Sequence, residues 1–356
     1  MEIYIAIFIF ELSFGLTIAK KRTKYKNVFL IVSYILLSVV AALRTKEVGV
    51  DTLQYYRAYL RIGDLTWYNV LNERYEIGFL ILCKILNRIT ENPQSLIILT
   101  SMFINFSVIR FINKNSNNVV YSVLCYMLLN FYFSYMNIMR QAIAIAILLF
   151  AFECLKNDKK IRYFILVGLA TTFHGSAILG ILYFVLYKYE YKMKYNKIVI
   201  PLLIITFIFG RQILMFLGSL SERLYGYIGS EFDKANYFGA LINFILSFII
   251  WWFGNNIIKN KKDLNELPKN IMLYNKLIIV NLVFTLLTVR VSIFNRFTPY
   301  FSIFQIIWLS NILETMKKNK QFFKILIIVV LIFYWLIIMI YRPEWYGVVP
   351  YKMIDL

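Results

Sequence analysis

Apolar stretches long enough to cross a lipid bilayer fill most of this chain and limit what it can fold into. A helix of roughly 17–25 apolar residues crosses the hydrocarbon core, and the chain holds about ten such stretches. The 356 residues are 60% hydrophobic, far above the share in soluble globular domains. A continuously apolar stretch that crosses the bilayer satisfies its backbone hydrogen bonds as a helix, because the hydrocarbon core offers no water as a partner. We predict one all-α polytopic transmembrane domain over residues 1–356, with about 11–12 spanning helices.

The net charge of +20 would suggest a nucleic-acid partner in a soluble protein. Here the lysines and arginines gather in short polar segments between apolar stretches, which is typical of cytoplasmic loops that face anionic lipid. We therefore expect membrane lipid as a partner and no nucleic acid. The cysteines lie in apolar stretches at no metal-like spacing, so we expect no metal and no cofactor. The basic clusters are residues 20–26, 156–162, 188–197, 259–276 and 317–324.

Placing these clusters in the cytoplasm predicts a topology. The N-terminus then lies outside, and residues 44–94 form a long first extracytoplasmic loop. Within that loop, residues 76–90 are apolar but carry two cations, Lys84 and Arg88. Each charge would cost about 2.5–3.5 kcal/mol at the bilayer centre. We therefore predict an amphipathic helix lying in the interface.

The stretch YFILVGLATTFHGSAILGILYFVLY lies between two predicted cytoplasmic clusters and must enter and leave the membrane on the same side. We predict two short helices that meet at His174 and Gly175. A helix broken at membrane depth is tolerated only where it lines protein or water.

The same topology brings several ionisable side chains to the outer face, among them arginines that run against the positive-inside tendency. Arginine offers a planar pair of donors that matches a phosphate, and a helix N-terminus adds free N–H groups. We predict that Arg140, Arg290 and Arg296 bind a diphosphate. Pairing with lipid headgroups or with local carboxylates is the alternative. The outer-face set is Arg44, Asp51, Glu76, Arg140, His174, Arg290, Arg296 and Arg342.

His174, the one histidine of the chain, and the carboxylates of Asp51 and Glu76 are candidate proton acceptors. The alternatives are a hydrogen-bonded packing histidine and helix-capping carboxylates. Arg44 is expected to form an ion pair with Asp51 and to help bind the diphosphate. Aromatic rings of this loop are expected to stack on sugars, although the aromatic belt of a membrane protein explains them equally well. The rings are those of Tyr55, Tyr56, Trp67, Tyr68 and Tyr75, with Trp345 near the C-terminus.

An ordered set of short motifs resembles the EpsG family of bacterial exopolysaccharide and capsule clusters, grouped with the Wzy-type polysaccharide polymerases. The motifs are RTKEVGVDTLQYY, YEIGF, NIMRQAIA, FHGSA and RVSIFNR with a Pro-Tyr pair shortly after. The resemblance runs from about residue 44 to the last apolar stretch.

This resemblance implies a membrane glycosyltransferase of GT-C-like architecture in the bacterial cytoplasmic membrane, with its active site facing outward. It implies a substrate, oligosaccharide repeat units on undecaprenyl diphosphate, which are joined into exopolysaccharide, capsule or O-antigen. A chain-length regulator protein is a further expected partner. Three alternatives stay open: an O-acyltransferase that modifies the polysaccharide, a lipid-linked glycan transporter and an O-antigen-type ligase.

Overall fold

The computed structural model describes residues 1–19, 24–189, 196–219, 225–234, 237–261, 267–268 and 270–354. Four-fifths of the chain is helical, and the described residues contain no strand. Five of the described helices are long and apolar enough to span a membrane, or up to seven if each of two bent pairs is one span. The protein is therefore an all-α, multi-pass membrane protein, with fewer full-length spans than expected because several helices are short or bent. The predicted basic clusters at 20–26, 188–197 and 259–276 lie partly outside the described residues.

The contacts group the chain into two compact units, residues 1–180 with 319–356, and residues 181–318. The expectation of a single domain over residues 1–356 stays a prediction. The first unit contains α1 (Glu2–Ala19), α2 (Lys24–Ala42), α3 (Thr52–Asp64), α4 (Trp67–Val70), α5 (Ile77–Asn87), α6 (Gln94–Asn115), α7 (Val119–Leu128), α8 (Phe131–Asn137), α9 (Met139–Lys156), α10 (Lys160–Phe173), η1 (Gly175–Gly180), α19 (Lys320–Tyr341) and η6 (Pro343–Trp345).

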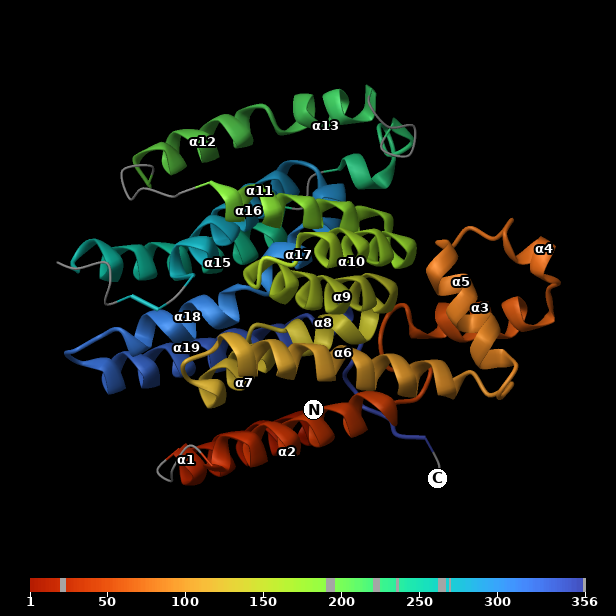
Figure 1. Ribbon diagram of the computed structural model, residues 1–356, viewed down its shortest axis with the longest axis horizontal. Coiled ribbons are helices and arrows are strands. Elements are labelled where there is room, and N and C mark those ends of the chain that lie inside the picture. The colour runs from red at the N-terminus through yellow and green to blue at the C-terminus, as the bar shows by residue number, and fades with distance from the viewer. Residues whose placement is uncertain are drawn as a thin grey trace. The chain divides into compact units, whose positions relative to one another are not determined.

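In the first unit, α9 lies at the centre and is buried along most of its length. It packs against α10 and α6, and α6 packs against α2. The helices α3, α4 and α5 gather at one end of α6 (Figure 1). The predicted outer loop is thus a folded helical cap at one end of this bundle, and α5 is the short amphipathic helix that the sequence predicts.

Basic residues gather at the other end of the same bundle. Lys26 Nζ donates to the carbonyl oxygen of Asn113 over 3.1 Å. Lys156 donates to the side chain of Asn115 and forms a 3.2 Å ion pair with Glu153. These amide and ammonium groups bind to the C-terminal ends of α6 and α9, where a cation is electrostatically favoured.

Three helix breaks shape the chain, and the sequence predicted only the one at His174. There α10 ends, His174 takes an extended conformation and η1 follows. Tyr163, near the start of α10, donates to the carbonyl oxygen of Gly180 at the end of η1, so the chain doubles back along α10. The other two breaks lie in helix pairs that together are long and apolar enough for one span each, Val119–Leu128 with Phe131–Asn137 and Asn196–Ile208 with Gly210–Ser219. The first bends by 52°, where Asn130 adopts a left-handed conformation, and the second by 72°.

The C-terminal segment crosses the ends of α1 and α2. Tyr4 donates to the carbonyl oxygen of Val348 over 3.1 Å, and Tyr351 donates to that of Val40 over 3.0 Å. The backbone N–H of Gly49 donates to Gly347 over 2.8 Å. The last residues therefore hold the start of the outer loop in place.

The second unit contains α11 (Ile181–Lys188), α12 (Asn196–Ile208), α13 (Gly210–Ser219), η3 (Glu231–Asp233), α15 (Tyr237–Lys259), α16 (Ile271–Arg290), η5 (Ser292–Arg296), α17 (Thr298–Ser302) and α18 (Gln305–Glu314). Here α16 is the central helix, and α15, α12 and α18 pack against it. Gly254 of α15 lies against the indole of Trp308, where an added Cβ would come within 2.5 Å of the ring nitrogen. This close packing of a glycine on a large ring joins α15 to α18.

Candidate functional site

The structure brings Glu76, Arg140 and His174 together in the first unit, although they lie in three separate stretches of the sequence. Arg140, in the first turn of α9, donates through Nη1 to the Glu76 carboxylate. The other oxygen of Glu76 accepts the backbone N–H of Gly175 at 3.3 Å. One carboxylate therefore joins the start of α5, the start of α9 and the break after α10.

The helix ends explain this arrangement. Glu76 stands immediately before α5, and Arg140 follows the first residue of α9. The backbone turns extended at His174, which leaves the N–H of Gly175 outside the α10 hydrogen bonds and able to meet an acceptor. Gly78 lies against the backbone of Thr172, so α5 and α10 approach closely enough for that contact.

Aromatic rings surround the guanidinium of Arg140. It lies 4.8 Å from the ring centre of Tyr75 and 5.9 Å from that of Phe79. Tyr55 packs edge-on to Phe79 at 5.7 Å. The Arg140 side chain is 21% exposed and that of Glu76 is 12% exposed, so both charges lie in a mostly dry setting where their attraction is strong. The Nε atom of Arg140 is buried and has no hydrogen-bond partner among the described residues.

The electrostatics of the cluster set the charge of Glu76. Burial raises the pKa of this carboxyl, but the charge of Arg140, the backbone N–H of Gly175 and the nearby His174 together hold the pKa below its ordinary value. Glu76 is therefore a carboxylate at neutral pH and a weak base. Its contacts are those of a residue that positions Arg140 and the segment around His174.

Asp51 reaches the same cluster through Tyr55. Burial raises the pKa of the Tyr55 hydroxyl to about 12, while the charge of Arg140 lowers it and that of Asp51 raises it. Both charges therefore lie near this hydroxyl, which stays protonated at neutral pH. Asp51 stands before α3 without capping it through its side chain, so its carboxylate is not used as a helix cap. The loop before it is held by Asn137, whose side-chain oxygen accepts the N–H of Val50 at 2.5 Å.

The imidazole of His174 is half-buried at the helix break. Its Nδ1 lies 2.7 Å from the hydroxyl of Ser176. The hydroxyl can donate to this nitrogen or accept from it, so the contact orients the ring in either tautomer. The sequence reasoning missed Ser176, although its place in FHGSA, two residues after the histidine, was a signal for a local contact.

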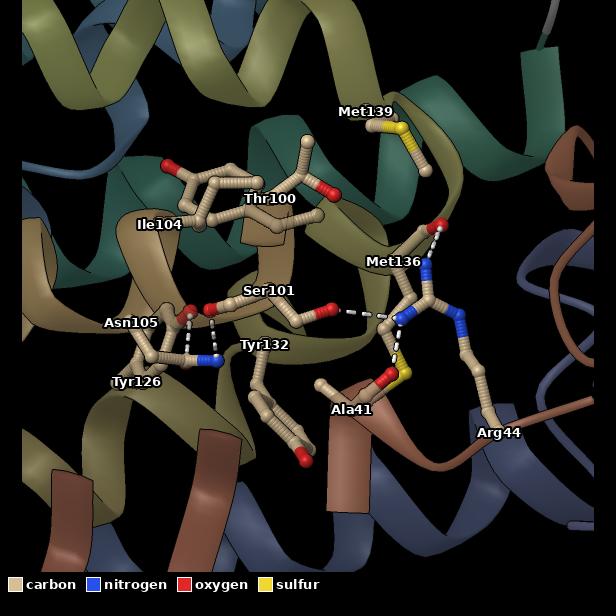
Figure 2. Close-up of a pocket in the computed structure, with 11 residues that line it drawn as sticks. Ala41, Arg44, Thr100, Ser101, Ile104, Asn105, Tyr126, Tyr132, Met136 and Met139 are labelled. Atoms are coloured by element: carbon tan, nitrogen blue, oxygen red, sulfur yellow. Dashed lines mark hydrogen bonds between the residues drawn. The ribbon is translucent and has the colours of Figure 1, made fainter. Parts of the chain in front are cut away.

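The structure separates Arg44 from this cluster. Arg44 is 1% exposed and donates to Ser101 Oγ over 2.9 Å, to the carbonyl oxygen of Met136 over 3.2 Å and to that of Ala41. Figure 2 shows these contacts around a small polar cavity between α2, α6 and α8. Burial lowers the pKa of Arg44 to about 10, so the side chain stays charged at neutral pH. The expected ion pair with Asp51 is therefore wrong: Arg44 binds carbonyl and hydroxyl oxygens at the end of α2.

The tyrosines predicted to hold sugars have packing contacts. Tyr55 is 5% exposed and Tyr75 is 8% exposed, and both rings pack against Phe79. Tyr56 is half-buried, and its hydroxyl donates to Gln94 over 2.8 Å. Gln94 in turn donates to the carbonyl oxygen of Arg44, which ties α3 to the ends of α2 and α6. A contact between these rings and sugar stays a prediction.

In the second unit, Arg290 is the last residue of α16 and Arg296 is the last residue of η5. Arg290 lies over the ring of Phe207 at 5.2 Å and next to Gly210, in the bend between α12 and α13. Arg296 donates to the hydroxyl of Tyr227 over 2.5 Å and lies 4.8 Å from the ring centre of Phe232. Both guanidinium groups therefore have aromatic neighbours, and their binding of a diphosphate stays a prediction. Among the described residues, no three His, Cys, Asp or Glu side chains group as metal ligands.

Comparison with protein families finds one that matches almost the whole chain. The model of the EpsG family covers residues 27–353. This range includes the cluster of Asp51, Glu76, Arg140 and His174 and both arginines of the second unit. Comparison with curated proteins and with solved structures finds no match.

Proposed function

Because the chain belongs to the EpsG family, a family of Wzy-type polysaccharide polymerases, we propose that it polymerises oligosaccharide repeat units carried on undecaprenyl diphosphate. The growing glycan is transferred from its lipid diphosphate to a hydroxyl of an incoming lipid-linked unit. The product enters an exopolysaccharide, a capsule or an O-antigen. The observation that carries this proposal is the Glu76–Arg140 ion pair beside the helix break at His174.

Transfer breaks the bond between the anomeric carbon and the diphosphate oxygen and forms a bond to the acceptor oxygen. Negative charge grows on the leaving diphosphate, and Arg140 stabilises it from the first turn of α9. The acceptor hydroxyl loses its proton to His174 or Asp51. Glu76 acts as a positioning residue, because its contacts with Arg140 and Gly175 orient both parts of the site.

The bundle of the first unit supports an outward-facing site in the bacterial cytoplasmic membrane. The cluster lies at the end where α5 and α9 begin, whereas Lys26, Asn115 and Lys156 meet at the other end. Basic loops favour the cytoplasmic side. The proposed donor and acceptor are amphiphiles that stay in the membrane, so a folded cap at the interface is a suitable place to bring them together. A chain-length regulator protein is a further proposed partner.

The test is a gel of lipid-linked glycans from cells that lack this protein, complemented with wild type or with variants. We expect single repeat units without a ladder in the deletion strain, and a ladder restored by wild type. Arg140→Ala and His174→Ala should not restore it. Thr171→Ala is the matched control, since its hydroxyl bonds only the carbonyl oxygen of Gly168 on the same helix, over 2.6 Å.

A ladder that persists in the deletion strain would overturn the polymerase proposal. Labelled acetate that reaches the polysaccharide only when the protein is present would then favour an O-acyltransferase. Repeat units that accumulate on the cytoplasmic leaflet would favour a transporter. A normal polymer that is not attached to its final acceptor would favour a ligase.

A further inference from the structure

A second polar cleft lies in the helical cap, at the other end of α3 and α5 from the Arg140 cluster. It has a volume of about 330 Å³ and is lined by Gly63, Leu65, Thr66, Trp67, Lys84, Asn87 and Arg88. All of these residues belong to the first unit. The cleft shares no lining residue with the Arg140 cluster, so it is a separate feature of the cap.

The helices α3 and α5 run in the same direction. The Arg140 cluster therefore lies near the start of both helices, and the cleft lies near their ends. Tyr55 meets Phe79 near the start of both helices. Gly63 meets Asn87 near their ends, where a Cβ on the glycine would come within 2.3 Å of the Asn87 amide nitrogen. At 1.5 Å per residue, the cleft lies about 12 Å farther along α5 than Phe79. One sugar ring cannot cover that distance, but an oligosaccharide can.

The floor of the cleft is rigid. Lys84 Nζ donates to the carbonyl oxygens of Ile62 over 3.2 Å, of Gly63 over 2.7 Å and of Leu65. These contacts close the C-terminal end of α3, where a cation is favoured. Arg61 and Glu73 add a two-point ion pair, with both contacts at 2.8 Å, between α3 and the segment before α5. Hydrogen bonds and an ion pair within the cap thus hold the cleft in shape.

The walls offer an aromatic face with hydrogen-bonding groups beside it. Trp67 is 43% exposed, and the guanidinium of Arg88 lies over one face of its ring, 5.6 Å from the ring centre. The guanidinium of Arg88 makes no hydrogen bond to any residue that the structure describes, and only its backbone N–H donates, to the carbonyl oxygen of Leu86. The Asn87 side chain has one long contact, 3.5 Å to the carbonyl oxygen of Tyr59. An indole that packs on the apolar face of a sugar ring, with an amide and a guanidinium for its hydroxyls, suits a carbohydrate.

We propose that this cleft is a saccharide subsite that binds the oligosaccharide at a sugar remote from the bond being formed. The proposal rests on the proposed function and concerns how the polymerase site recognises its substrate. The three donors of Lys84 are all used on backbone carbonyls, so the ammonium adds charge but no free donor for a phosphate. The Arg88 guanidinium suits a sugar hydroxyl or a phosphate, whereas the Trp67 ring and the Asn87 amide beside it suit a sugar. Binding a remote sugar contributes to catalysis, because it fixes the acceptor or the growing chain at the reacting end.

The test measures binding, not turnover. The full chain in phosphatidylcholine nanodiscs is titrated with the lipid-free oligosaccharide released from the host polysaccharide by partial acid hydrolysis. We expect Trp67→Ala to weaken the affinity about tenfold. Trp67→Phe keeps an aromatic face and should retain most of the affinity. Leu71→Ala is the control, since Leu71 lies in the same cap, is 62% exposed and does not line the cleft. Equal affinities for Trp67→Ala and wild type, or an equal loss in Leu71→Ala, would overturn the subsite.

Two further measurements complete the test. The first distinguishes a sugar site from a lipid headgroup site, and the second tests the subsite separately from the polymerase proposal. In nanodiscs that contain phosphatidylglycerol, a change in tryptophan fluorescence that is absent from Trp67→Phe and that the oligosaccharide does not produce would identify a lipid headgroup site and overturn the subsite. Arg140→Ala should bind the oligosaccharide as wild type does and yet form no ladder. In cells, Trp67→Ala should give a ladder of shorter chains. The binding result therefore stands independently of the polymerase test.

Discussion

Gly78 of α5 and Thr172 of α10 are in backbone contact, and a Cβ on Gly78 would come within 2.8 Å of the Thr172 carbonyl oxygen. Backbone atoms cannot rotate away as a flexible side chain does. The hydrogen bond from Gly175 to Glu76 lies beside this contact. The position of the helix break relative to Glu76 thus depends on a glycine at this point of YEIGF.

We predict that Gly78→Ala lowers the free energy of unfolding by about 1–3 kcal/mol, since overpacking must push α5 away from α10. It should also abolish the glycan ladder, because Glu76 moves with α5. Gly168→Ala is the control: this glycine lies in α10 and a Cβ there meets nothing within 4 Å. Thermal unfolding in detergent and the glycan gel measure both effects. A Gly78→Ala protein with wild-type stability and ladder would contradict the prediction.

The ion pair between Glu76 and Arg140 is expected to add stability that depends on pH. The folded-state pKa of Glu76 lies below its ordinary 4.5, so its contribution is full above that value and is lost as the pH falls through the folded-state pKa. Wild type should exceed Glu76→Gln by about 1–3 kcal/mol at pH 7. The difference should shrink towards zero as the pH falls well below 4.5. Unfolding curves of both proteins from pH 7 to acid check it, and a constant difference would rule it out.

Arg44→Ala should destabilise the first unit without acting on the substrate site. Removing the guanidinium leaves the carbonyl oxygens of Ala41 and Met136 without that donor and opens a buried void, which costs about 3–5 kcal/mol. We expect little folded protein on size-exclusion chromatography. Arg57→Ala is the control, since Arg57 is exposed on α3. Normal folding of Arg44→Ala with a selective loss of substrate affinity would restore the diphosphate-binding role first expected for Arg44.

Gly347→Ala should loosen the start of the outer loop. Gly347 has a φ of +60°, and a Cβ there would lie 3.0 Å from the backbone nitrogen of Val50, next to Asp51. Gly229→Ala is the matched control, with a φ of +78° and nothing within 4 Å. Backbone strain should lower the free energy of unfolding of both variants by about 1 kcal/mol. Only Gly347→Ala should also speed hydrogen exchange at residues 48–52, and equal exchange in the two variants would refute the contact.

Short-range signals in the sequence were enough to predict several features. Apolar length predicted a helical, multi-pass membrane protein, although it overestimated the number of full-length spans, and the two charges among apolar residues predicted the short helix α5. The break at His174 followed from loop charge alone, because a stretch between two cytoplasmic loops must turn back. The bends at Asn130 and before Gly210 escaped prediction, since each lies inside a continuous apolar run where hydropathy does not change.

The residues of the candidate site illustrate the limit of such signals. Outward-facing charge singled out Glu76, Arg140 and His174, which the fold does bring together. The same criterion selected Arg44, yet the fold surrounds it with carbonyl oxygens. An arginine at a helix end is compatible with both outcomes, and only the approach of α6 and α8 to the end of α2 decides between them.

By itself, the sequence determined a helical membrane protein, its family and the ionisable residues that gather near helix ends, because these depend on apolar length, charge and local motifs. The tertiary structure decided which of those charges meet. Glu76 pairs with Arg140 across 64 positions, and Gly78 allows α5 to contact α10. It also formed the cleft beside Trp67 from the ends of α3 and α5. Such contacts depend on how helices distant in the sequence pack, and no local pattern of residues encodes that geometry.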